Sequence, residues 1–238
     1  LLKCLFPLVL LAASGHALAQ KVVQVASGYN HHALLREDGS VWTWGDNQSA
    51  QLGDGTKLNR ASPGVVPGLT NVVRIAAGGF HTLALRSDGT VWAFGANDLG
   101  QLGDGGTALR NSAQPVPGLT GVVALAGGGY HSLALKSDGT LWSWGYNAYG
   151  QLGDGSNVLR TRPVAVTGLS GIAGVAAGVQ HSVAVRSDGT VWTWGLNDAG
   201  QLGDGGAANR SLPAAVPGLT AVTAASAGWN HTLARRSD

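Results

Sequence analysis

Five histidines occupy equivalent places in the sequence, one every 50 residues: His31, His81, His131, His181 and His231. Imidazole nitrogens bind metals and act as general bases, so this column is the first candidate for a reactive site. A metal site, however, needs several ligands that converge on one ion. Because each histidine belongs to a different copy of one repeated segment, we expect the five side chains to be distributed among the units and not to converge on one ion. We therefore expect each histidine to be hydrogen-bonded within its own unit, and we predict no metal site.

Two columns of charged residues follow the same spacing. The acidic column is Asp54, Asp104, Asp154 and Asp204, and the basic column is Arg60, Arg110, Arg160 and Arg210. Carboxylates on loops suggest calcium, but these loops lack the D-x-[DN]-x-[DN]-G spacing of a calcium loop. We therefore expect each aspartate to stabilise a turn and to pair with the arginine of its own unit.

The sequence offers no set of residues for catalysis. A Ser-His-Asp triad or a carboxylate pair on a repeat protein would require one unit to differ chemically from the others. No unit departs in this way. The GDG segments are not followed by the Lys-Ser/Thr of a phosphate-binding loop. We predict that the protein is not an enzyme and uses no cofactor.

The repeated segment itself is long and regular. HTLALRSDGTVWAFGANDLGQLGDG, residues 81–105, returns as HSLALKSDGTLWSWGYNAYGQLGDG at residues 131–155. A repeat of this length indicates a solenoid, a propeller or a similar array. We divide residues 20–238 into four complete units and one partial unit: 22–71, 72–121, 122–171, 172–221 and 222–238.

Each unit carries the pattern of short β-strands. Apolar residues alternate with others over residues 81–86 and 90–94, and the segment SDG between them is typical of a hairpin turn. A shorter strand precedes the histidine and another follows the long loop. Four antiparallel strands in a unit that repeats radially predict an all-β fold, a β-propeller. Aromatic residues at identical places in every unit suit the packing between blades: Trp42, Trp92, Trp142 and Trp192 in one column, and Trp44, Phe94, Trp144 and Trp194 in the other.

Composition narrows the class of partner. Charged residues make up 12% of the 238 residues, and the formal net charge is +2. Disordered chains combine high charge with low hydrophobicity, which this chain does not. Lysines and arginines occur singly with aspartates close by, so no clustered basic face is available for nucleic acid. We predict no nucleic-acid partner.

The first 19 residues have the features of a secretory signal peptide. Lys3 precedes an apolar run over residues 4–13, and Ala17-Leu18-Ala19 has small residues where a signal peptidase cuts. We expect removal of residues 1–19, a secreted or periplasmic protein and no membrane contact after removal; the alternative is a buried strand or helix. The single cysteine, Cys4, lies in this segment, so the exported chain would have no disulfide. Because the chain starts with Leu and stops within a unit, we expect it to be part of a longer protein.

The segments AAGGFHTLAL and DGTVWAFGANDLGQLGDG resemble the repeats of the regulator of chromosome condensation family. The resemblance covers about residues 22–238 and implies a propeller, typically of seven blades, here seen as about four and a third repeats. Members of that family include a nucleotide-exchange factor, a UV-B photoreceptor and an inhibitor of β-lactamase, so the fold does not choose the function. The photoreceptor carries Trp two residues before the repeated His. Here only Trp229 matches, so we expect no UV sensing.

The units differ most at the tips of their long loops. We take as candidate partner-binding residues Leu99, Tyr146, Tyr149 and Leu196. Exposed aromatic side chains are frequent in protein-binding surfaces. Drift at tolerant loop positions is an alternative explanation.

From these observations we expect a secreted or periplasmic, non-enzymatic propeller that binds another macromolecule, namely a protein. Two alternatives remain open. A guanine-nucleotide exchange factor for a small GTPase would need a cytosolic or nuclear address. A hydrolase or inhibitor hosted on the propeller would need a converging polar site.

Overall fold

The computed structural model describes residues 21–238 of the chain. The signal peptide predicted for residues 1–19, including Cys4, lies outside the described residues. From residue 21 onward every regular element is a β-strand. Nowhere in this part of the chain is there a helix with the length and apolar character needed to cross a bilayer.

The strands form four four-stranded sheets and one two-stranded sheet. The first contains β1 (Val22–Ser27), β2 (His31–Arg36), β3 (Val41–Gly45) and β4 (Arg60–Val65). The second contains β5 (Val72–Ala77), β6 (His81–Arg86), β7 (Val91–Gly95) and β8 (Arg110–Pro115). The third contains β9 (Val122–Gly127), β10 (His131–Lys136), β11 (Leu141–Gly145) and β12 (Arg160–Ala165). The fourth contains β13 (Ile172–Ala177), β14 (His181–Arg186), β15 (Val191–Gly195) and β16 (Arg210–Ala215), and the fifth β17 (Val222–Ala227) and β18 (Thr232–Arg236).

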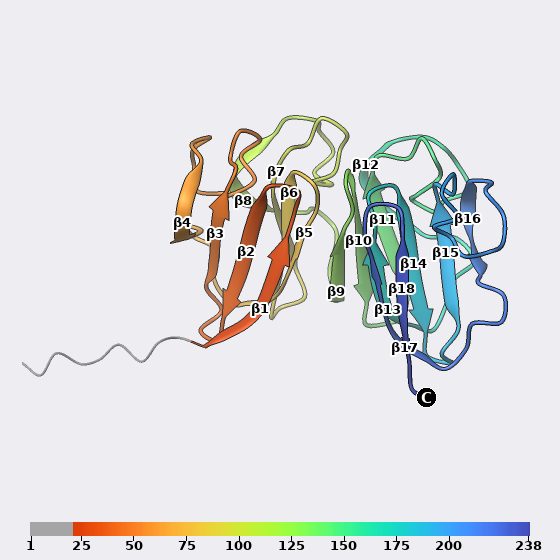
Figure 1. Ribbon diagram of the computed structural model, residues 1–238. Coiled ribbons are helices and arrows are strands. Elements are labelled where there is room, and N and C mark those ends of the chain that lie inside the picture. Colours follow the sequence, from red (N-terminus) through yellow and green to blue (C-terminus); the bar gives the residue numbers. More distant parts are fainter. Residues whose placement is uncertain (1–20) are drawn as a thin grey trace, which may run out of the picture.

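Within each sheet, strands that follow one another in sequence lie side by side and pair antiparallel. In the second sheet, for example, His81 pairs with Gly95 at one end of the β6–β7 ladder and Leu85 with Val91 at the other. Figure 1 shows the sheets standing upright next to one another, with β1–β8 on the left and β9–β18 on the right. Four-stranded antiparallel sheets repeated in this way are the blades of a β-propeller, which confirms the predicted fold class. We number them blades 1–5 in chain order.

The SDG segments form the turns between the second and third strands. In blade 2, the Asp88 Oδ1 atom accepts hydrogen bonds from the backbone N–H of Thr90 at 2.9 Å and from its hydroxyl at 2.6 Å. Gly89 has a φ of 79°, a left-handed conformation that glycine adopts without strain. The predicted hairpin therefore depends on the aspartate as an acceptor and on the glycine for its backbone conformation.

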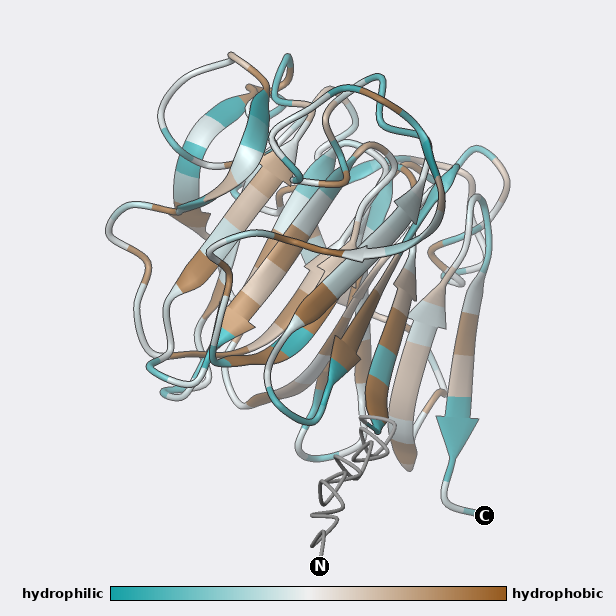
Figure 2. Ribbon diagram, turned by 90° about the vertical axis from the view of Figure 1, so that its left-hand side faces the viewer, coloured by the Kyte–Doolittle hydropathy of each residue, from teal (hydrophilic) through white to brown (hydrophobic). Residues whose placement is uncertain are grey.

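The core lies between the blades. One cluster packs Leu83 and Leu85 of blade 2 against Ala134 and Trp144 of blade 3. Figure 2 shows apolar stretches along the strands. Three aromatic residues of the second column are fully buried: Phe94, Trp144 and Trp194. Their predicted role in packing between blades is confirmed.

The first tryptophan column is less buried. Trp92 is half-buried, and the guanidinium carbon of Arg86 lies 3.9 Å above the centre of its ring. Trp142 is covered in a similar way by the Lys136 ammonium at 5.6 Å. Both columns contact the clusters between blades, since Trp92 and Trp142 pack against them while partly exposed. The first column differs because a cation covers the part of the ring that the neighbouring blade leaves open.

Candidate functional site

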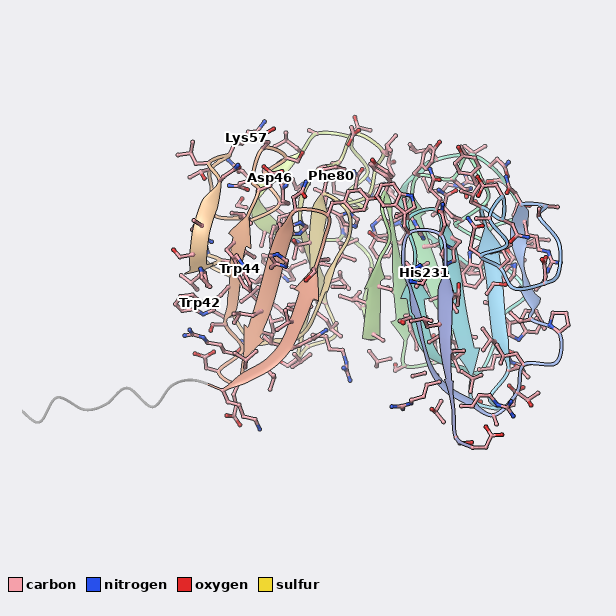
Figure 3. All side chains as sticks on the ribbon, viewed as in Figure 1. Trp42, Trp44, Asp46, Lys57, Phe80 and His231 are labelled. Atoms are coloured by element: carbon pink, nitrogen blue, oxygen red, sulfur yellow. The ribbon has the colours of Figure 1, made fainter. Side chains whose placement is uncertain are left out.

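Two kinds of connection meet at one end of the blades. Because the strands alternate in direction, the turn between the first two strands of a blade and the long loop between its last two strands emerge at the same end. Figure 3 shows Asp46 and Lys57 of the β3–β4 loop and Phe80 of the β5–β6 turn together at the top. We call this end the upper face.

A buried asparagine fixes the shape of each long loop. In blade 2, the Asn97 Oδ1 atom accepts the backbone N–H of Leu102 at 2.9 Å. Its Nδ2 atom donates to Asp104 Oδ1 at 3.1 Å and to the carbonyl oxygen of Gly106 at 3.2 Å. Asn97 is fully buried, so one side chain satisfies several backbone groups of the loop. The loops are therefore a rigid support for the side chains at their tips.

The charged columns pair locally, as predicted. The Arg110 Nε atom donates to Asp104 Oδ2 at 2.6 Å, and Arg160 makes the same bond to Asp154 at 2.8 Å. Burial alone would raise the pKa of Asp104. Hydrogen bonds from Gly106 and Asn97 and the charge of Arg110 outweigh that effect, so the pKa is lowered. These carboxylates therefore stabilise the long loops through hydrogen bonds and ion pairs to residues of the same loop.

The histidines do not bond within their own unit, and that expectation was wrong. The Nε2 atom of His81 in blade 2 lies 2.9 Å from the hydroxyl oxygen of Ser132 in blade 3. That hydroxyl donates to the carbonyl oxygen of Gln101 at 2.9 Å, so Nε2 carries the proton and donates to the serine. Three other pairs repeat the bond: His31 with Thr82, His131 with Ser182, and His181 with Thr232. The column joins blades because each second strand lies against the following blade.

The environment of these histidines makes them poor acids and bases at neutral pH. Burial, with a smaller effect of neighbouring histidines, lowers the pKa of His81 and of His131 to about 3. Burial also lowers the pKa of His31 and of His181 to about 4. General acid–base catalysis is most effective when the pKa lies near the working pH. Among residues 21–238, no three His, Cys, Asp or Glu side chains gather where a metal ion could be held.

Six aromatic side chains form a connected series on the upper face. We call it the aromatic track: Trp229, Tyr29, Phe80, Tyr130, Tyr146 and Tyr149. The Trp229 and Tyr29 rings are stacked, with centroids 5.5 Å apart and an angle of 12° between their planes. Tyr29 meets Phe80 edge to face at 5.1 Å, and Phe80 lies 5.9 Å from Tyr130.

The track continues outward over blade 3. The Tyr130 ring lies 6.4 Å from Tyr146, which in turn meets Tyr149 edge to face at 6.1 Å. Trp229 is 64% exposed and the other five side chains are half-buried. Such pairs contribute about 0.5–1.5 kcal/mol beyond the area that they bury. The rings therefore hold one another in place while part of each remains open to a partner.

The inner end of the track borders a cavity of about 330 Å³. Each of the five blades contributes residues from the end of its first strand to this cavity, so it lies on the propeller axis. Most of the lining is glycine backbone, with the side chains of Tyr29, Val179 and Trp229. A Cβ atom on Gly79 would lie 2.6 Å from the carbonyl oxygen of Gly129, so the blades approach too closely there for any side chain.

Tyr29 links the track to this cavity. Its hydroxyl oxygen is buried and has no hydrogen-bond partner among the described residues. Burial, together with the nearby Tyr130, raises the pKa of Tyr29 to about 12. The hydroxyl is therefore neutral and available to donate to a group that enters the cavity.

The four residues predicted to bind a partner have different environments. Tyr146 and Tyr149 are half-buried members of the track, and Leu99 is half-buried at the tip of the blade 2 loop. Leu196 is only 7% exposed. The expectation that Leu196 contributes to an exposed patch is wrong, because its apolar side chain folds against the protein instead of pointing into solvent.

Sequence reasoning missed the inner part of the track. Tyr29, Phe80, Tyr130 and Trp229 lie in the turns between first and second strands, one or two residues before the repeated histidine. The unit 172–221 has Val179 and Gln180 at these two positions, so the residues there vary between units as the loop tips do. Variation at these two positions is therefore the sequence feature that could have identified the inner part of the track.

Comparison with known proteins identifies a family and solved structures that this chain resembles. The sequence profile of the RCC1-like domain family matches residues 6–237, which confirms the predicted resemblance. The crystal structure of Prp20p from Saccharomyces cerevisiae is 27% identical, with a TM-score of 0.82 over 91% of this chain. Human WBSCR16 is 26% identical, with a TM-score of 0.84 over 93% of this chain. The matches span 56% and 59% of those two chains.

Two curated proteins match this chain over the length of a single repeat. The human E3 ubiquitin-protein ligase HERC2 is 46% identical over 50 residues, which are 21% of this chain and 1% of that protein. A Caenorhabditis elegans homologue of the X-linked retinitis pigmentosa GTPase regulator is 42% identical over 48 residues, which are 20% of this chain and 4% of that protein. The chain thus spans a small part of the curated relatives it matches.

Proposed function

This chain belongs to the RCC1-like domain family, and we propose that it is a non-enzymatic propeller that binds another protein through its upper face. The aromatic track carries this proposal. Aromatic residues are enriched in protein-binding surfaces because they bury a large area and lose little conformational freedom. The six rings form one continuous surface from the axis to the loop tips of blade 3.

The upper face has the other properties that a binding surface needs. Its loops are held by buried asparagines such as Asn97 and by Asp–Arg pairs, so ordering them on binding costs little. The track side chains are not required for the interblade hydrogen bonds or for the buried apolar clusters. Their substitution should therefore leave the fold of this chain intact.

Named relatives support protein binding without identifying the partner. Prp20p is described together with its binding properties to Gsp1p and histones, and yeast RCC1 (Prp20), 28% identical, has been solved with Kap60 bound. Gsp1p, histones and Kap60 are partners of the yeast protein. For this chain we transfer only the class of partner, a protein, and leave its identity to experiment.

We further propose that the protein works outside the cytoplasm and that it has further blades. The basic start, apolar run and Ala17-Leu18-Ala19 segment support export and cleavage after residue 19. The family's usual seven blades support a ring larger than the five blades described. Export disfavours a role as an exchange factor for a cytosolic GTPase.

Capture of partners on the immobilised protein tests the proposed function. Exported proteins are passed over the wild type, Trp229→Ala and Lys57→Ala, and the retained proteins are identified by mass spectrometry. We expect at least one protein that is retained by the wild type and by Lys57→Ala but lost on Trp229→Ala. Lys57 is an exposed residue of the blade 1 loop outside the track, which makes it the control. Equal retention on all three proteins would refute binding through the track, and catalysed nucleotide exchange on a small GTPase would favour the alternative.

A further inference from the structure

A buried glutamine recurs in every long loop. Gln51, Gln101 and Gln151 are fully buried, and Gln201 is 4% exposed. The side-chain oxygen of each accepts the backbone N–H of the residue two positions earlier, as in Gln101 with Leu99 at 2.9 Å and Gln151 with Tyr149 at 3.0 Å. The acceptor half of each amide is therefore used in the same way in all four loops.

The donor half is satisfied by a carboxylate in three of the loops. In blade 1, the Gln51 Nε2 atom donates to Asp46 Oδ2 at 2.8 Å. In blade 2, Gln101 Nε2 donates to Asp98 Oδ1 at 3.2 Å. In blade 4, Gln201 Nε2 donates to Asp198 Oδ1 at 3.3 Å. Two different positions of the loop can thus place a carboxylate next to this amide.

Blade 3 has a carboxylate at neither position. Tyr146 stands where blade 1 has Asp46, and Ala148 stands where blades 2 and 4 have Asp98 and Asp198. The Gln151 Nε2 atom is consequently buried with no hydrogen-bond partner among the described residues. Leaving a buried donor unpaired costs about 1–3 kcal/mol. The loop that lacks this acceptor is also the only one of the four that carries two tyrosines at its tip.

We propose that the aspartate or glutamate side chain of a bound protein supplies the missing carboxylate and accepts from Gln151 Nε2. This inference rests on the proposed function and names the chemistry of the partner, an acidic segment. The incoming carboxylate takes the place that Asp98 and Asp198 occupy in the loops on either side. In those loops the resident aspartate repels a second carboxylate, so recognition is confined to blade 3.

Tyr146 and Tyr149 provide the rest of the site. Their rings offer apolar surface to the residues that flank the acidic one, and their hydroxyl groups are further donors to its carboxylate. The Gln151 amide is covered in this structure, so a ligand reaches it by displacing a neighbouring side chain. The position of Asp46 in blade 1 shows that a side chain at the Tyr146 position lies against the amide. The proposal therefore requires movement of the side chain at this position, which is Tyr146 in blade 3.

The test uses two synthetic peptides, acetyl-Ala-Leu-Asp-Leu-Ala-amide and its Asn-centred twin, with the side-chain amide signals of Gln151 followed by NMR. We expect the acidic peptide to shift these signals and to bind about 10-fold more tightly than its neutral twin, because charge-assisted hydrogen bonds are roughly twice as strong as neutral ones. Ala148→Asp restores the carboxylate found in blades 2 and 4. It should abolish the shift while leaving the fold intact.

A reciprocal variant provides the matched control. Asp98→Ala removes the resident carboxylate of blade 2, and the Gln101 amide should then respond to the acidic peptide, although more weakly because the tyrosines are missing there. Absence of any shift at Gln151, an equal response to the Asn-centred peptide, or binding that persists in Ala148→Asp would overturn the inference. If the track variants still lose a captured partner while Gln151 is silent, only the acidic-segment inference fails. If Gln151 responds to the acidic peptide but no partner depends on the track, the proposed function fails instead.

Discussion

The Nε2 atom of His81 donates to the hydroxyl of Ser132, which lies 51 residues further along the chain in the next blade. The hydroxyl in turn donates a hydrogen bond to the carbonyl oxygen of Gln101, which lies in the same blade as His81. The carbonyl oxygen of Gln101 also accepts the indole N–H of Trp144 at 2.8 Å. Each pair of blades is therefore joined by a buried polar link beside the apolar contact.

Ser132→Ala should destabilise the protein by about 1–3 kcal/mol, because it leaves the buried imidazole N–H without its acceptor. Urea denaturation of the variant measures the loss. Ser137 lies in the exposed turn of the same blade, so Ser137→Ala should change stability by less than about 0.5 kcal/mol. Equal midpoints for the two variants would mean that the interblade hydrogen bond contributes nothing.

Stability should fall as the pH drops below about 6.5, the ordinary pKa of histidine. Burial lowers the pKa of His81 and His131 to about 3 in the folded protein, so between these values only the unfolded chain takes up the protons. Each such histidine removes up to about 1.4 kcal/mol per pH unit in this window. The carboxylates with lowered pKa values act only below about pH 4, so they do not contribute between pH 7 and pH 5.

Urea midpoints at pH 7, 6 and 5 test this dependence. The midpoint should decrease at each step, and His81→Gln should decrease less steeply because it has one buried histidine fewer. A midpoint that does not change between pH 7 and pH 5 would show that these imidazoles are not buried in neutral form.

Trp144→Ala should cost about 3–5 kcal/mol, since the side chain is fully buried between blades and its N–H is hydrogen-bonded. Trp142→Ala should cost clearly less, because that ring is half-buried beneath Lys136. Thermal and urea melts of the two variants compare the columns directly. A larger loss for Trp142→Ala would reverse our assignment of which tryptophan belongs to the core.

Local features of the fold could be predicted because they repeat within one unit. The spacing of the histidines defined the units, and alternation around SDG predicted the strands on either side of Gly89. The Asp104–Arg110 pair could also be predicted, since both residues lie in one loop. In each of these cases the interacting groups are close in sequence.

Contacts between units could not be predicted in the same way. The bond from His81 to Ser132 depends on how one blade lies against the next, which no spacing within a unit specifies. The Tyr29–Trp229 stack joins the first and fifth blades, and only the curvature of the whole array brings those rings to 5.5 Å. Leu196 shows that variation between loops does not by itself predict exposure, since the structure buries this variable loop residue.

The affinity of a captured partner for Tyr146→Ala, compared with the wild type and Lys57→Ala, tests the central claim most directly. Isothermal titration calorimetry should show a loss of about 2 kcal/mol or more for Tyr146→Ala, the usual size of a hot-spot effect, and no loss for Lys57→Ala. The thermal midpoint of Tyr146→Ala should stay close to that of the wild type, so that the loss reports on the surface. Unchanged affinity in Tyr146→Ala would contradict the claim that the aromatic track binds the partner.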